Sequence, residues 1–106
     1  NYKNKSTSVI FQPHLFSRTR DFMEDFATVL SKFDEVYLLE IYPAREKPIE
    51  GVSSKVLLEK ISSEKKEIIN KELINDIIIN SKTEVISILG AGNITENLNK
   101  KIFTND

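Results

Sequence analysis

The sequence predicts an α/β domain with a mostly parallel sheet and helices on both of its faces. Two observations support this fold class. Short apolar runs typical of strands alternate with segments of helical periodicity, and a length of 106 residues suits a single domain. The share of charged residues, 29%, is ordinary for a globular chain and leaves enough apolar residues for a core. The crossovers between parallel strands should be right-handed.

The first half of the chain predicts two strands with a helix between them. Ser8–Gln12 is a β-branched and aromatic run ended by Pro13, which indicates a buried strand. From about Arg18 to Phe33 apolar residues recur every three or four positions, which indicates one helix. Its inward stripe would consist of Phe22, Met23, Phe26, Val29, Leu30 and Phe33. Glu35–Tyr42 predicts a second strand, closed by Pro43.

The middle of the chain predicts a loop and then a short helix. Residues 43–51 hold two prolines and a glycine, which favour a loop. Ser53 or Ser54 can cap a helix that runs to about Ile61. The inward side chains of that helix would be Val56, Leu57 and Ile61.

The last part predicts two more strands and two more helices. Glu67–Asn70 indicates a short strand, and Glu72–Ser81 a helix. That helix would bury Leu73, Ile74, Ile77 and Ile78. Thr83–Leu89 predicts a strand that stops at a glycine pair, Gly90 and Gly92. Thr95 can then cap a final helix that buries Leu98 and Ile102.

Three polar segments should meet at one edge of the predicted sheet. Pro13–Asp21, Pro43–Ser54 and Gly90–Thr95 each follow a predicted strand. Ligands of open parallel sheets bind beside the carboxyl ends of the strands. We therefore expect a binding site where these segments converge.

The first of these segments has the composition of an anion site. His14, the only histidine, follows a strand directly, and Arg18 and Arg20 follow at the start of a helix. Arginine can hold a carboxylate or phosphate through two parallel hydrogen bonds. The alternative is that His14 is a turn residue and that the arginines pair with nearby acids. Those acids would be Asp21, Glu24 or Asp25.

The other two segments offer weaker candidates. In the second, Arg45 and Glu46 are better candidates for a site than Lys47 and Glu50, which we expect to be solvated. The third segment, with Gly90 and Asn93, resembles a dinucleotide turn only in part. Thr95 occupies the position of the third glycine, so a tight turn is the preferred interpretation.

Several classes of function lack their usual signals in this sequence. The net charge of −1 gives no support for attraction to nucleic acid or membranes. Without cysteine there is no disulfide or thiolate metal site, and one histidine with scattered carboxylates predicts no metal site. A phosphate-binding loop with Lys and Ser or Thr is also missing. The start, polar and without methionine, suggests a fragment of a longer protein.

The three segments together resemble the C-terminal domain of the Mur ligases of peptidoglycan synthesis. The similarity lies in Phe11–His14 with Ser17–Thr19, in Ile41–Ile49, and in Gly90–Ile94, so it covers nearly the whole chain. Among these ligases it points to the members that join L-alanine to UDP-N-acetylmuramate. The resemblance implies a Rossmann-like three-layer fold for residues 1–106, with the UDP-sugar-binding and central ATP-binding domains absent.

The resemblance also implies a reaction. In the intact enzyme ATP phosphorylates the lactyl carboxylate of the UDP-sugar, and L-alanine then attacks the acyl phosphate to form an amide. ATP and magnesium would be bound mainly by the central domain of the same chain, which this domain contacts. We therefore expect no cofactor, metal or catalytic residue in the fragment, which should be inactive alone. A bacterial cytoplasmic location and roles in cell-wall biogenesis, cell shape and cell division follow from the family.

By position, His14 and Arg18 resemble the residues that hold the carboxylate of the incoming alanine. Family members often carry a basic residue where this chain has Leu15, and many have Ala-Gly-Glu where it has Ala44-Arg45-Glu46. We then expect substrate or nucleotide near five further residues, namely Arg20, Arg45, Glu46, Gly90 and Asn93. The alternative function is a stand-alone Rossmann-like module that binds a small anion.

Overall fold

The structure, a computed structural model, describes residues 6–90 as four strands connected by short helices. The strands are β1 (Thr7–Gln12), β2 (Glu35–Leu38), β3 (Lys65–Ile68) and β4 (Val85–Gly90). The helices are α1 (Phe16–Asp21), α2 (Met23–Leu30), α3 (Ser54–Glu59) and α4 (Ile74–Asn80), and the 3-10 turn η1 (Lys71–Leu73) precedes α4. None of the helices in this part of the chain is long and apolar enough to cross a membrane.

The sheet is parallel throughout, in the order β3-β2-β1-β4. β2 and β3 follow β1 in the chain and lie in turn on one side of it, whereas β4 lies on the other side of β1. The strand order therefore reverses between the paired strands β1 and β4. Such a topological switch point is where open α/β sheets form a crevice at the carboxyl ends of their strands. This arrangement confirms the predicted α/β class.

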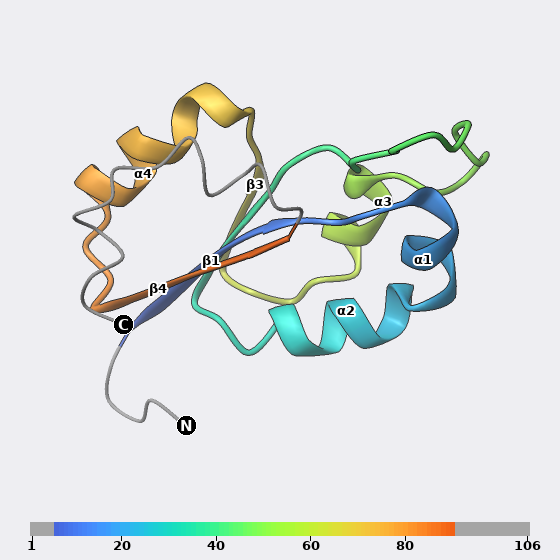
Figure 1. Cartoon of the computed structure of the whole chain (residues 1–106). Coiled ribbons are helices and arrows are strands. Elements are labelled where there is room, and N and C mark those ends of the chain that lie inside the picture. The colour runs from blue at the N-terminus through green and yellow to red at the C-terminus, as the bar shows by residue number, and fades with distance from the viewer. Residues whose placement is uncertain (1–5, 91–106) are drawn as a thin grey trace.

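Helices cover both faces of the sheet (Figure 1). Against one face α2 and α3 pack a core that includes Val9, Leu30 and Leu57. Against the other face α4 packs a second core around Ile10 and Ile74. Successive strand residues point to opposite faces, so the adjacent β1 residues Val9 and Ile10 serve one core each, and both are fully buried.

The helix expected over 18–33 is in fact two helices. α1 ends at Asp21 and α2 starts at Met23, with Phe22 between them at φ −114° and ψ 18°. The break rotates the buried face, so Phe22 and Val29, predicted inward, are 45% and 50% exposed. Met23 and Leu30 are buried as expected, and Ala27 lies with them.

Other boundaries differ by a few residues from the sequence prediction. β2 ends at Leu38, although Leu39 and Ile41 remain buried beyond it, and β3 starts two residues earlier than expected. Leu73, predicted buried, is 42% exposed because it lies in η1 rather than in the regular turns of α4. The predicted helix with Leu98 and Ile102 lies outside the described residues.

The start of α3 carries the serine cap that the sequence predicts. Ser53, in extended conformation, accepts a hydrogen bond on Oγ from the backbone N–H of Val56 at 3.1 Å. Ser54 instead is buried, and its hydroxyl donates to the carbonyl of Leu39. Ser53 is thus the cap, and Ser54 fastens α3 to the end of β2.

Ser53→Ala is expected to lower the free energy of unfolding by about 1 kcal/mol, because a helix N–H loses its acceptor. Urea denaturation of the chain measures the change. Ser62→Ala is the matched control, since Ser62 is exposed and its hydroxyl bonds no residue of 6–90; its effect should stay within about 0.5 kcal/mol. Equal losses in both variants would contradict the capping role.

Candidate functional site at the carboxyl edge of the sheet

The loops that follow β1 and β2 continue the parallel pairing of their strands. The N–H of Tyr42 donates to the carbonyl of Pro13, and the N–H of Leu15 donates to the carbonyl of Tyr42, both at 2.8 Å. His14 and Tyr42 form an isolated parallel bridge. These bonds bring two of the three predicted segments together at one edge, as expected from the topology.

His14 lies on the surface of this edge, against an aromatic ring. Its imidazole stacks on the ring of Tyr42, with 5.4 Å between centroids and 13° between planes. His14 is exposed, and Tyr42 is 36% exposed. The stacking limits the orientations of the imidazole while its ring nitrogens remain available to a ligand.

The turn between His14 and α1 is strained. Leu15 has φ 74° and ψ 137°, a conformation that residues with a Cβ rarely adopt. Its carbonyl accepts from both the N–H and the hydroxyl of Thr19, which is completely buried. Strain of this kind persists only where surrounding contacts impose it, and it is common at functional sites.

Arg18 lies in α1 and points its charge toward solvent rather than into an ion pair. Its side chain is exposed and pairs with no carboxylate among residues 6–90. Arg20 differs, since its Nε lies 3.0 Å from Oδ1 of Asp21. The structure therefore supports the alternative of a local ion pair for Arg20 only. Glu24, another expected partner, pairs with Lys60.

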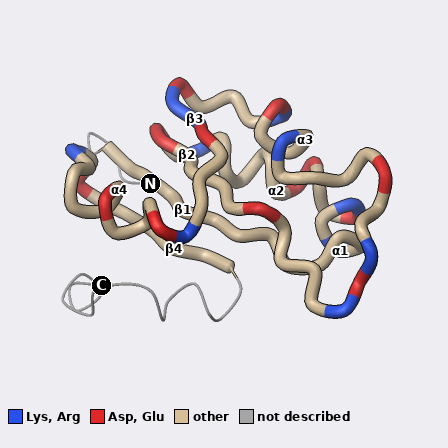
Figure 2. The backbone as a smooth tube through the Cα atoms, turned by 90° about the horizontal axis from the view of Figure 1, so that it is seen from above, with Lys and Arg blue, Asp and Glu red and all other residues tan. Residues whose placement is uncertain are grey.

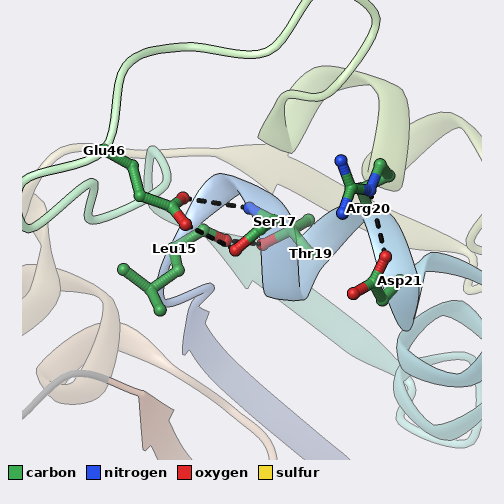
Figure 3. Close-up of polar contacts among 6 residues, drawn as sticks. All are labelled: Leu15, Ser17, Thr19, Arg20, Asp21 and Glu46. Carbon is green, nitrogen blue, oxygen red and sulfur yellow. Dashed lines mark hydrogen bonds and ion pairs between the residues drawn. The ribbon is translucent and has the colours of Figure 1, made fainter.

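Glu46, from the loop after β2, binds the first turn of α1 (Figure 3). Its Oε1 accepts from the N–H of Ser17 at 3.0 Å, and its Oε2 accepts from the Ser17 hydroxyl at 2.5 Å. The turn just before it includes Ala44, a second non-glycine residue with positive φ, at 53°. A carboxylate suits this place because the N–H groups at a helix start lack partners within the helix.

These contacts lower the pKa of the Glu46 carboxyl below its usual range. The hydroxyl of Ser17 has the largest effect, its N–H adds to it, and partial desolvation opposes both. A depressed pKa stabilises the fold above the ordinary glutamate pKa of about 4.3, and the stabilisation is lost as pH falls through the lower folded value. The contact is therefore fully charged at neutral pH.

A pH series is expected to show this linkage. The difference in unfolding free energy between the parent chain and Glu46→Gln should be constant near neutrality and should shrink below about pH 4. Chemical denaturation at each pH measures it. A difference that stays the same down to pH 2 would mean that the ionised carboxylate is not the stabilising species.

The remaining candidates lie around this edge. Arg45 is exposed in the turn next to Glu46, and basic and acidic positions lie together at this end of the molecule (Figure 2). Gly90, with φ 138°, ends β4 directly against Gln12 of β1. A Cβ at Gly90 would approach the Gln12 carbonyl oxygen to 2.7 Å, so this approach requires glycine. Asn93 lies outside the described residues.

This edge presents exposed hydrogen-bond donors. Among residues 6–90 no group of three or more His, Asp or Glu side chains is placed so that it could hold a metal ion. His14 and Arg18 supply hydrogen-bond donors, and Arg18 supplies a charge that no carboxylate in this part of the chain neutralises.

Sequence reasoning did not single out two of the residues that shape this site. Tyr42 was placed only as a strand end, yet its ring supports His14 and its backbone pairs with the first loop. In the sequence Ser17 stands out only as part of the motif Ser17–Thr19, yet in the structure it anchors Glu46. A signal for Ser17 existed in its position at the start of a helix, where serine often bonds backbone or acidic partners.

The order of strands and the helices on both faces define a Rossmann-like α/β domain, with exposed His14 and Arg18 at the carboxyl edge of the sheet. A comparison with protein-family profiles finds no match. Curated proteins, however, match nearly the whole chain.

Three relatives show the extent of this similarity. The UDP-N-acetylmuramate–L-alanine ligase of Christiangramia forsetii is 56% identical over 93% of the chain, which spans 22% of that enzyme. The ligase of the same name from Flavobacterium psychrophilum is 48% identical over 90% of the chain, and that of Parabacteroides distasonis 50% identical over 88%. The chain spans 21% and 20% of these two relatives.

Identity near one half along almost the entire chain indicates common descent. Along nearly its whole length the chain is thus homologous to a segment of these UDP-N-acetylmuramate–L-alanine ligases that spans about a fifth of their length. The resemblance expected from the three segments is thereby confirmed. What the whole enzyme does is a separate question for this chain.

Proposed function

We propose that this chain is the C-terminal domain of a ligase that joins L-alanine to UDP-N-acetylmuramate in peptidoglycan precursor synthesis. Its task in that enzyme is to hold the incoming amino acid against the other two domains. The observation that carries the proposal is an exposed pair of donor groups, His14 and Arg18, on either side of the strained turn at Leu15. Relatives that carry this ligase name match the chain at 48–56% identity.

The proposed site uses charge-assisted hydrogen bonds to the carboxylate of L-alanine. Arg18 can present two parallel N–H groups to the two carboxylate oxygens, and the imidazole of His14 can add a third donor. Binding the carboxylate leaves the amino group of alanine directed away from the domain. Orientation of this kind raises the rate of attack on an activated acyl group, because the reactants no longer have to find each other.

The other components of the reaction belong to the rest of the proposed enzyme. ATP supplies the phosphoryl group that activates the UDP-sugar carboxylate, and ATP and magnesium are assigned to the central domain, which this domain contacts. A bacterial cytoplasmic location follows from these substrates, and neither nucleic acid nor membrane is proposed as a partner. Arg20, Arg45, Gly90 and Asn93 are assigned to the surface that faces substrate or nucleotide.

Phosphate release tests this function. The full-length protein that carries the chain should release phosphate from ATP only when UDP-N-acetylmuramate and L-alanine are both present. The isolated chain should release none. Turnover by the isolated chain, or equal turnover by the full-length protein without L-alanine, would overturn the proposal.

The second candidate is a stand-alone module that binds a small anion, favoured by the charge of Arg18 that is unpaired within residues 6–90. Calorimetric titration of the isolated chain with nucleotides and amino acids distinguishes the two. Tight binding by the isolated chain favours the module, and absence of binding favours the ligase domain.

A further inference from the structure

The two loops that meet at the carboxyl edge are tied at two points. The first tie consists of the backbone bonds of Tyr42 to Pro13 and Leu15. The second is the Glu46 carboxylate, which bonds the N–H and hydroxyl of Ser17 across 29 residues of sequence. His14 precedes the strained turn at Leu15, and α1, with Ser17 in its first turn, follows it (Figure 3).

The strain needs both ties. Leu15 at φ 74° would relax toward negative φ if the chain on either side could turn, which would rotate α1 relative to β1. The Tyr42 bonds fix the backbone before the turn, and Glu46 fixes the helix after it. Ala44, also at positive φ, lies in the second loop just before Glu46. One strained residue in each loop thus lies next to the contact that joins them.

We infer that Glu46 is a positioning residue, whose bonds to Ser17 set the direction in which α1 presents Arg18 beside His14. The inference rests on the proposed function and assigns Glu46 a role that is distinct from contact with substrate or nucleotide. The carboxylate also takes the N–H of Ser17, so an incoming carboxylate cannot use that group. The exposed side chains of Arg18 and His14 remain as donors for the ligand.

The test is a steady-state comparison in the full-length ligase. Glu46→Gln keeps the size of the side chain but replaces one acceptor oxygen by an NH2 donor that cannot accept from Ser17. The KM for L-alanine should rise about tenfold, because a displaced binding group loses its alignment. The KM values for ATP and UDP-N-acetylmuramate should stay within about twofold. Ser17→Ala, which removes only the hydroxyl bond, should change the alanine KM in the same direction by less.

Glu50→Gln is the matched control, since Glu50 is an exposed carboxylate of the same loop and bonds no residue of 6–90. It should leave all three KM values unchanged. Hydrogen exchange provides a readout that is independent of activity. The peptide that contains Ser17 should exchange faster in Glu46→Gln than in Glu50→Gln, because a neutral amide oxygen accepts from the Ser17 N–H more weakly than the carboxylate does.

Relief of the strain should weaken the dependence on Glu46. In a Leu15→Gly background the turn adopts its φ without penalty, so Glu46→Gln should raise the alanine KM by less than it does with Leu15 present. Equal increases in the two backgrounds would mean that Glu46 does not act through the turn, and would overturn the inference.

The outcomes separate the inference from the function on which it rests. If Arg18→Ala raises the alanine KM while Glu46→Gln leaves it unchanged, the positioning role is wrong and the function stands. If Glu46→Gln raises the KM for ATP instead, Glu46 contacts nucleotide and the inference is wrong. If neither variant changes the alanine KM, the proposed function fails together with the inference.

Discussion

Arg18→Ala in the full-length ligase is expected to raise the KM for L-alanine about tenfold to a hundredfold. A charge-assisted hydrogen bond contributes about 1.5–3 kcal/mol, which corresponds to that range of affinity. The loss should not be compensated locally, because Arg18 pairs with no carboxylate of residues 6–90 and has no structural partner to release. Steady-state kinetics with L-alanine as the varied substrate measures the effect.

Two comparisons make this result specific. Lys32→Ala removes an exposed positive charge at the end of α2, away from the loops, and should leave the alanine KM unchanged. Arg20→Ala should have a smaller effect than Arg18→Ala, because Arg20 already pairs with Asp21. Unchanged alanine kinetics in Arg18→Ala would assign Arg18 to the surface and would remove the main support for a carboxylate site.

Gly90→Ala is expected to lower the free energy of unfolding by about 2–4 kcal/mol, the sum of backbone strain and steric overlap. The new Cβ would lie 2.7 Å from the carbonyl oxygen and 2.9 Å from the nitrogen of Gln12, and backbone atoms cannot move aside as a flexible side chain can. The pairing of β1 with β4 should therefore loosen at its carboxyl end. Urea denaturation of the chain measures the loss.

Gly51→Ala separates the two causes. Gly51 also has positive φ, at 82°, but a Cβ there would meet nothing within 4 Å. Its substitution should cost about 1 kcal/mol from backbone strain alone. If Gly90→Ala lowers the free energy of unfolding no more than Gly51→Ala does, then β4 can move away from Gln12 without a steric penalty. The close approach would then contribute nothing to the loss.

Local patterns in the sequence predicted most of the architecture. The run before Pro13 and the caps around Ser53 depend on neighbouring residues only, so β1 and α3 lie where expected. The break at Phe22 has no such signal, because no glycine or proline marks it. The two helices bury different side chains, Thr19 in α1 and Met23, Ala27 and Leu30 in α2, and this packing depends on the tertiary fold.

The site was predictable in its location but not in its internal contacts. Alternation of strands and helices places the ends of β1 and β2 at one edge, and the structure places His14 beside Tyr42 there. The bond between Glu46 and Ser17 joins residues 29 positions apart, and no periodicity relates them. That bond depends on the exact path of both loops, which tertiary packing decides.

The place of β1 in the sheet has a consequence for the order of folding. β1 pairs with β2 soon after it in the chain, but its other neighbour is β4, and a hydrogen bond from Glu84 to Ser6 spans 78 residues. Closing so long a loop is slow, and β1, which is synthesised well before β4, must wait for it. Until then the β4 side of β1 is an unpaired edge that can associate with other chains, so the nascent domain is most vulnerable to aggregation there.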